Sequence, residues 1–176
     1  MKKIIALGGS NSKESINKQF AHYASGLIEE ADLIKLDLND FTIPMYGIDE
    51  EKENGMPKDA ENLTKLIQNT DGIVISLAEH NGAYTAAFKN VFDWISRIEA
   101  KVFETTPVLL LSTSPGGRGG ASVMQIALDR FPRHGATIPA YFSLPNFYDN
   151  FKDGKLVNEE LLSELKEKVK LFEGAI

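Results

Sequence analysis

Five apolar runs along the chain predict five β-strands, at residues 3–7, 32–38, 72–77, 108–111 and 137–142. The runs at 72–77 (GIVISL) and 108–111 (VLLL) are continuous rather than alternating. Strands that are buried on both faces have this pattern, which is typical of a parallel sheet with helices on either side.

Between and after these strands, apolar residues recur at helical spacing. Strand and helix therefore alternate five times, which predicts an open α/β sheet with right-handed crossovers. The five stripes are Ile16, Phe20, Tyr23, Leu27 and Ile28; Leu63, Leu66 and Ile67; Phe88, Val91, Phe92, Ile95 and Ile98; Met124, Ala127, Leu128 and Phe131; and Leu162, Leu165, Val169 and Phe172.

Two irregular stretches interrupt the pattern, at 41–59 and 144–156. The first is long for a loop in a compact domain, which indicates a function. The second is rich in aromatic and turn-forming residues. No repeat, low-complexity tract or linker is visible, so we expect one domain over residues 1–176.

Composition narrows the class of protein. A net charge of −6 argues against broad nucleic-acid binding, which needs clustered Lys and Arg. The absence of cysteine excludes disulfides, thiolate catalysis and Cys-ligated metals. The apolar segment at the start is too short for a signal peptide, and no stretch approaches the roughly 18 apolar residues of a membrane span. We therefore expect a cytoplasmic protein.

Polar, glycine-containing loops follow three of the predicted strands. They are GGSNSKES after the first, AEHNGAYT after the third and STSPGGRGG after the fourth. In a doubly wound sheet, ligands bind beyond the carboxyl ends of the strands, near the point where the strand order reverses. The three loops are therefore expected to converge on one ligand site.

The first loop favours phosphate binding. A helix start exposes backbone N–H groups and a partial positive charge, and serine and asparagine side chains add donors. Ser15 alone would suit a helix N-cap, but one cap does not need the other groups. The candidate donors are Ser10, Ser12, Ser15 and Asn17, with Lys13 as a source of charge.

The third and fourth loops are suited to a flat heterocycle. Glu79, His80 and Asn81 lie at a strand end, where Gly82 permits a tight turn, although a solvent-facing histidine is the simpler alternative. The glycines of SPGGRGG would let a flat ligand approach the backbone, unless they form only a flexible turn.

Other chemistry has little support in the sequence. The sequence contains no Walker motif (G-x-x-x-x-G-K-[ST]), no dinucleotide-binding motif (G-x-G-x-x-G) and no nucleophile elbow (G-x-S-x-G). It also lacks the residue spacing of known metal sites. Trp94 is expected in a core or an interface, and His22 and His134 are expected to be structural or exposed.

At the three loops the sequence resembles the NADPH-dependent FMN reductase family, which has a flavodoxin-like fold and includes quinone, azo-dye and chromate reductases. The first-loop pattern G-S-x-R-x-x-S-x-N is matched at Gly9, Ser10, Ser15 and Asn17. The third-loop pattern P-E-Y-N-x-S-x-P-x-x-L-K-N-A-I-D-W-x-S-R is matched at Glu79, Asn81, Lys89, Asn90, Asp93, Trp94, Ser96 and Arg97. The fourth, S-x-S-x-G-G-x-G-G, is matched at Ser112, Ser114, Gly116, Gly117, Gly119 and Gly120.

The resemblance implies a three-layer sandwich around a five-stranded parallel sheet of order 2-1-3-4-5. It also implies roles by position. The FMN phosphate would be held by Ser10, Ser12, Ser15, Ile16 and Asn17. The isoalloxazine would be lined by Glu79, His80, Asn81 and Gly82. Its other polar edge would be covered by Ser114, Pro115, Gly116 and Gly117.

Some positions depart from the family pattern. The phosphate-loop arginine is replaced by Ser12 with Lys13 beside it, and lysine lacks the bidentate fork of arginine. This predicts a lower phosphate affinity. Ala78, His80 and Ala83 stand where the family has Pro, Tyr and Ser.

The resemblance implies an enzyme that passes a hydride from NADPH or NADH to FMN. Electrons would then pass to a quinone, an azo compound, a metal oxyanion or a flavin. The cofactor carries this chemistry, so no catalytic side chain is expected. A homodimer or homotetramer is also implied. Two other classes stay open: a flavodoxin-like electron carrier without pyridine-nucleotide activity, and a scaffold or sensor that has lost flavin.

Overall fold

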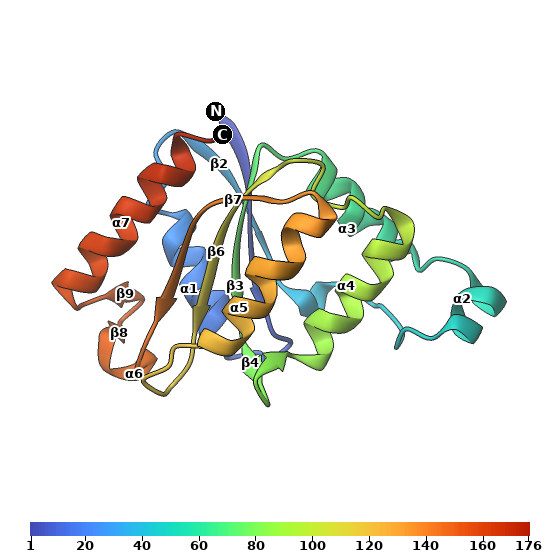
Figure 1. Ribbon diagram of the computed structural model, residues 1–176, viewed down its shortest axis with the longest axis horizontal. Helices are drawn as coiled ribbons and strands as arrows, with labels where there is room; N and C mark the ends of the chain where they lie inside the picture. Colours follow the sequence, from blue (N-terminus) through green and yellow to red (C-terminus); the bar gives the residue numbers. More distant parts are fainter.

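The computed structural model describes residues 1–176 and contains one five-stranded parallel sheet in the order β2-β1-β3-β6-β7 (Figure 1). The strands are β1 (Lys2–Gly9), β2 (Ala31–Leu36), β3 (Gly72–Leu77), β6 (Pro107–Thr113) and β7 (Thr137–Leu144). Counted in chain order, these are the five predicted strands in the order 2-1-3-4-5. The flavodoxin-like α/β fold is therefore confirmed.

Helices cover both faces of the sheet, as the continuous apolar strands predict (Figure 1). On one face lie α1 (Ile16–Ser25) and α7 (Glu159–Glu173), and on the other lie α3 (Lys58–Gln68), α4 (Ala86–Ile98) and α5 (Ala121–Arg130). In β1, Ile4 and Ala6 pack in the core under α1 and α7, whereas Ile5 and Leu7 pack in the opposite core. Both faces of each central strand are thus buried.

The first strand extends further than predicted, because both glycines of GGSNSKES belong to it. Gly8 and Gly9 continue the parallel register with Ser76 and Leu77. A Cβ on Gly8 would lie 2.5 Å from the backbone nitrogen of Lys18. Glycine is therefore needed here so that α1 can pack closely over the end of β1.

The prediction of an irregular stretch at 41–59 is wrong in part, because it contains α2 (Ile48–Asn54) and leads into α3 at residue 58. Acidic residues in the first turn of α2 favour the helix through its dipole, and Gly55, with a φ of 75°, ends it. None of its residues is buried, so the apolar pattern carries no signal. Figure 1 shows α2 projecting from the body of the molecule.

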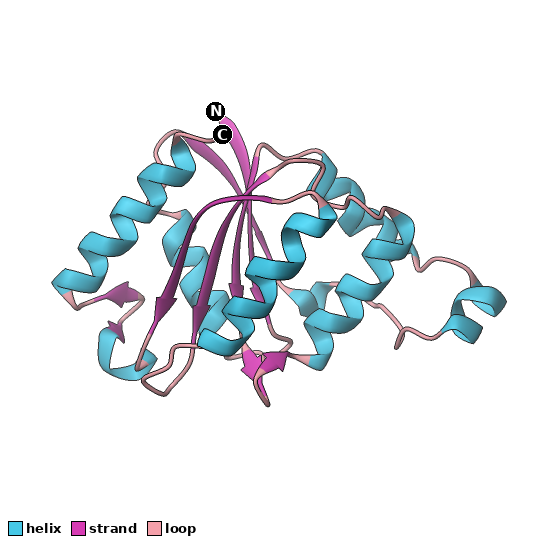
Figure 2. Cartoon of the chain, viewed as in Figure 1, coloured by secondary structure: helices cyan, strands magenta, loops and turns pink.

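Small elements lie near the carboxyl edge of the sheet, and Figure 2 separates their hairpins from the loops. The stretch 144–156 forms α6 (Phe147–Asn150) and a hairpin of β8 (Phe151–Lys152) and β9 (Lys155–Leu156). A second hairpin joins β4 (Glu79–His80) to β5 (Ala83–Tyr84). There are also two 3₁₀ turns: η1 (Leu38–Asp40), after β2, and η2 (Phe131–His134), between α5 and the start of β7. None of the helices combines the length and the apolar character that crossing a lipid bilayer requires.

Candidate functional site

The three polar loops converge at the carboxyl edge of the sheet around a cavity of about 210 Å³. All of them contribute to its lining, as predicted. The predicted residues that line it are Ser10, Ser12, Ser15, Ile16, Asn17, Glu79, His80, Ser114 and Pro115. Four predicted residues are outside the lining: Asn81, Gly82, Gly116 and Gly117. The other four lining residues were not predicted: Glu14, Ala78, Thr113 and Tyr148.

The first loop presents the start of α1 to the cavity. Ser15 is the N-cap, and its hydroxyl oxygen accepts a hydrogen bond from the Lys18 N–H at 3.1 Å. The N–H groups of Ile16 and Asn17 have no backbone or side-chain acceptor, as is usual in a first helical turn. These two donors, together with the serine hydroxyls, suit an anion. The capping role of Ser15 is thereby established, whereas its contact with phosphate stays a prediction.

The side chain of Asn17 is committed to the protein itself. Its Nδ2 donates to the Thr113 carbonyl at 3.1 Å, while Oδ1 accepts from the Thr113 N–H at 3.0 Å and from the Ser76 hydroxyl at 2.7 Å. Asn17 is only 2% exposed. It therefore fixes the start of α1 to the ends of β3 and β6, and its backbone N–H is the group left for a ligand.

Glu79 reaches across to the fourth loop. Its Oε2 accepts hydrogen bonds from the N–H groups of Ser122 at 2.9 Å and Val123 at 3.0 Å. The N-cap of α5 is Gly120, which has no side chain to make such bonds. The carboxylate thus caps α5 from another loop, where the helix dipole favours a negative charge. Glu79 thereby holds the third and fourth loops together.

The tip of the third loop is a tight hairpin turn. Asn81 and Gly82, with φ values of 51° and 76°, occupy its two central positions. A two-residue turn with two positive φ angles favours Asn-Gly. This conformation explains both residue types without a ligand, while His80, on the exposed strand beside them, lines the cavity.

The fourth loop is held by backbone contacts with the segment that follows β7. The Phe147 N–H donates to the Ser114 carbonyl at 3.1 Å, and the Asn146 N–H donates to the Gly116 carbonyl at 3.0 Å. A Cβ on Gly116 would meet nothing within 4 Å, so its glycine is not required by the packing of the protein. Open space above this backbone permits a flat ligand to approach it.

Tyr148, on α6, is a lining residue that no motif indicated. The residue is 63% exposed, and its ring packs edge-on against Phe147, with 5.6 Å between the ring centroids. The aromatic residues of 144–156 were the available signal, but nothing in the sequence placed them beside the first loop.

Neither a lysine nor an arginine side chain lines the cavity. Lys18, in the first turn of α1, forms an ion pair with Asp37 instead. Desolvation acts to raise the pKa of Asp37, but the hydrogen bonds from Lys18 and Asn39 outweigh it and lower that pKa. An anion in the cavity would therefore rely on N–H and O–H donors of groups other than lysine and arginine side chains.

The α4 residues that match the third-loop pattern attach the segment 41–57 to the body of the molecule. Trp94 is fully buried, as predicted, and its Nε1 donates to the Pro44 carbonyl at 2.8 Å. Asn90 accepts from the backbone N–H of Tyr46 at 2.7 Å. Arg97 forms two hydrogen bonds of 2.9 Å with Glu51, which lower the pKa of that carboxyl.

Each of the two histidines outside the cavity contacts a backbone carbonyl of the protein. This agrees with a structural role, which was one of the two predicted alternatives. His22 lies 3.3 Å from the Leu36 carbonyl, and burial lowers its pKa although this hydrogen bond opposes the shift. His134 lies 2.9 Å from the Ala100 carbonyl and packs edge-on against Phe92.

Comparison with known proteins identifies the family. Residues 2–149 match NADPH-dependent FMN reductases. The chain belongs to this family. It is 31% identical over 119 residues to a quinone reductase of Escherichia coli, an alignment that covers 68% of this chain and 63% of that enzyme. It is 27% identical over 122 residues to an NADPH azoreductase of a Bacillus species, which covers 69% of this chain and 64% of that enzyme. The chain thus spans less than two thirds of the length of these relatives.

Solved structures of similar shape support the fold assignment. The flavoenzyme NAD(P)H:(acceptor) oxidoreductase FerB from Paracoccus denitrificans superimposes with a TM-score of 0.83 over 99% of this chain and 97% of that one. The two sequences are 21% identical, so this likeness establishes the shared flavodoxin-like fold.

Proposed function

We propose that this family member is an FMN-dependent enzyme that oxidises NADPH or NADH and reduces a quinone, an azo compound, a metal oxyanion or a flavin. The observation that carries the proposal is the cavity at the carboxyl edge of the sheet. It joins the unpaired N–H groups of the first turn of α1 to the loops that bear His80 and Pro115.

The donor set of the cavity suits the phosphate of FMN. The N–H groups of Ile16 and Asn17 would bind its oxygens at the positive end of the helix dipole. The hydroxyls of Ser10 and Ser12 line the same cavity and would donate as well. Ser15 would act by fixing the helix start at which these groups gather.

The cavity is smaller than the roughly 300–1,000 Å³ of a typical small-molecule site. It would take the phosphate end of FMN, while the flat ring would extend past His80, Pro115 and the open backbone of Gly116. When bound, the flavin supplies the hydride-transfer chemistry. The protein's own part would be to bind and orient it while leaving one face open to NAD(P)H and to an acceptor.

A binding and turnover experiment tests the proposal. The purified protein is titrated with FMN, and NADPH and NADH oxidation is then followed with a quinone, an azo dye, chromate or free FMN as acceptor. Saturable FMN binding with FMN-dependent turnover is expected. FMN binding without NAD(P)H oxidation would instead indicate an electron carrier, and no FMN binding would leave only a scaffold or sensor.

We further propose that the protein is a homodimer or homotetramer in the cytoplasm. Two large apolar side chains at the projecting segment support self-association, since Met45 is 71% and Ile48 is 50% exposed. Light scattering at several concentrations would measure the mass. A monomer at all concentrations would contradict the assembly, and cell fractionation would test the location.

A further inference from the structure

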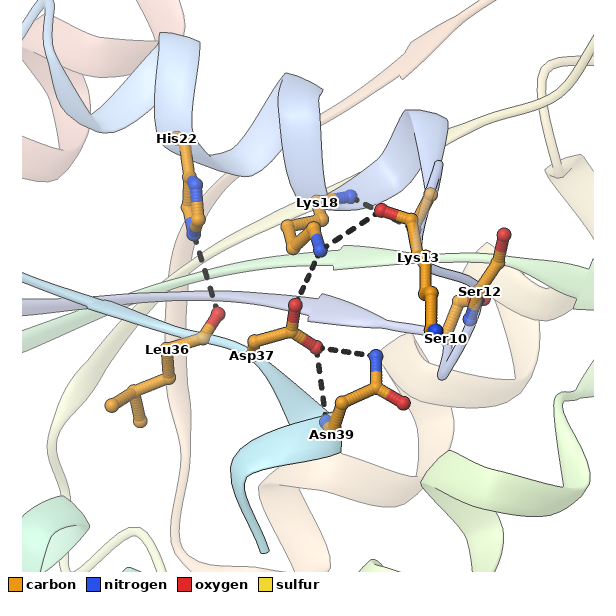
Figure 3. A network of polar contacts seen from close by, with 9 residues as sticks. Ser10, Ser12, Lys13, Lys18, His22, Leu36, Asp37 and Asn39 are labelled. Carbon is orange, nitrogen blue, oxygen red and sulfur yellow. Dashed lines mark hydrogen bonds and ion pairs between the residues drawn. The ribbon is translucent and has the colours of Figure 1, made fainter.

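Lys18 joins the first loop to the neighbouring strand, as the network in Figure 3 shows. Its Nζ donates to the carbonyl oxygen of Lys13 at 3.2 Å and forms an ion pair with the carboxylate of Asp37. Lys13 belongs to residues 10–15, here called the phosphate loop, and Asp37 directly follows β2. We propose that Lys18 is a positioning residue that sets the affinity for the FMN phosphate by holding this loop in place. This inference rests on the proposed function.

The phosphate loop has few other restraints. Its remaining hydrogen bonds are local. Three lie within residues 8–15: Ser10 N–H to the Gly8 carbonyl at 2.9 Å, Ser12 N–H to the Ser10 hydroxyl at 3.2 Å, and Ser15 N–H to the Ser12 carbonyl at 3.1 Å. Ser15 also accepts from the Lys18 N–H at its hydroxyl and from the Gln19 N–H at its carbonyl, both at 3.1 Å. The loop's own hydrogen bonds all end within residues 8–19. Lys18 is thus the group through which the loop is tied by polar contacts to another strand.

Both ends of this tie are fixed. The carboxylate of Asp37 also accepts hydrogen bonds from the backbone N–H of Asn39 at 2.9 Å and from its Nδ2 at 2.8 Å. The backbone of Lys18 packs against Gly8 so closely that a Cβ on that glycine would not fit. The side chains of Lys18 and Asp37 are only 20% and 25% exposed, so water screens the pair less than a surface pair.

Lys18 is placed to hold the phosphate loop and not to bind the phosphate directly. Its ammonium is paired with Asp37, and Lys18 does not line the cavity. Holding the Lys13 carbonyl would instead keep the hydroxyls of Ser10 and Ser12 in register with the free N–H groups of α1. The size of this effect on affinity depends on how well ordered the loop is. It should change the binding of the phosphate more than the binding of the flavin ring.

The test compares FMN with riboflavin, which lacks the phosphate. Dissociation constants of both are measured by flavin fluorescence on apo-protein of the wild type, Lys18→Met, Asp37→Asn and Lys18→Arg. Loss of the tie removes one or two hydrogen bonds, so the preference for FMN over riboflavin should fall about tenfold in both Lys18→Met and Asp37→Asn. The amide introduced by Asp37→Asn can still accept from Asn39, and Lys18→Arg should restore most of the preference.

A matched control is Asp129→Asn, which breaks the exposed ion pair with Arg133 away from the cavity and should leave the preference unchanged. If Lys18 acted as a charge on the phosphate, Lys18→Met would lower the preference and Asp37→Asn would raise it, which would overturn the proposal. An unchanged preference in both variants would overturn it too. Wild-type protein that binds FMN no better than riboflavin would refute this inference and the phosphate assignment, but not flavin-dependent activity, whereas failure to bind either flavin would refute the proposed function.

Discussion

Asn17 and Thr113 exchange two hydrogen bonds at the carboxyl edge of the sheet, although 96 positions separate them in the sequence. The amide of Asn17 reproduces the donor and acceptor pattern of a neighbouring strand, so that the first turn of α1 is joined directly to the end of β6. The same oxygen accepts from Ser76 at the end of β3. One side chain thus fixes the start of α1 relative to the two strands beside it.

Replacing Asn17 with Ala should lower the free energy of unfolding by about 2–3 kcal/mol, because it leaves the Ser76 hydroxyl and the backbone groups of Thr113 buried without partners. Chemical denaturation measures the loss. Asn69→Ala is the control, since Asn69 bonds only to the Lys65 carbonyl on the surface. A change in Asn17→Ala no larger than in the control would contradict this role.

Replacing Glu79 with Ala should cost about 1 kcal/mol of stability, because the N-terminus of α5 loses its cap. The third and fourth loops would also separate, so FMN affinity should fall more than in Glu79→Gln, which keeps an acceptor oxygen. Denaturation and FMN titration of both variants measure the two effects. Equal stability of the wild type and Glu79→Ala would show that the cap is dispensable.

Gly116→Ala should weaken FMN binding without loss of stability, because the added Cβ meets no protein atom but would enter the space in which we propose that the flat ring lies. Gly174→Ala is the control, with ordinary contacts of 3.6 Å and 3.7 Å at the end of α7. FMN titration and thermal melting of both variants give the comparison. Unchanged FMN affinity in Gly116→Ala would place the flavin elsewhere.

Tyr84→Phe should stabilise the protein by about 1 kcal/mol, because the buried Tyr84 hydroxyl has no hydrogen-bond partner. Burial raises the pKa of Tyr84 to about 12 from its ordinary 10.0. The pKa of Tyr84 is higher in the folded than in the unfolded state, so the unfolded state ionises first as the pH rises. The free energy of unfolding is therefore unaffected by the ionisation of this group below pH 10.0 and falls as the pH rises towards about 12.

The phenylalanine variant should therefore lose less stability than the wild type over that alkaline window, as followed by denaturation at a series of pH values. Tyr141→Phe, at a side chain that is 51% exposed, serves as the control. A Tyr84→Phe protein less stable than the wild type would mean that the hydroxyl has a partner in solution.

The sequence was sufficient for the sheet because its strands are buried on both faces. A continuous apolar run as short as 72–77 favours a central parallel strand, and the strand order followed from the family resemblance. The segment 48–54 was missed because α2 buries no residue and so has no apolar stripe. This helix is favoured by acidic residues in its first turn and by a glycine at each end. Both features are weaker signals in a sequence than apolar periodicity.

The candidate site was predicted at the level of loops better than at the level of side chains. The sequence predicts that Asn17 and Glu79 lie beside a ligand, but it does not show that each side chain bonds to a distant loop, since such contacts depend on tertiary structure. Tyr148 was missed for the same reason, because α6 meets the first loop only in the folded chain. The Asn81-Gly82 turn, by contrast, follows from its residue types alone.

The central claim is that the cavity holds FMN for reduction by a pyridine nucleotide. The most direct test is the visible absorption of the FMN-reconstituted, gel-filtered protein before and after anaerobic addition of NADPH, and then of NADH. We predict that the flavin band persists through gel filtration and bleaches with at least one of the two nucleotides. A band that stays unchanged with both, or a protein that retains no flavin at all, would contradict the account.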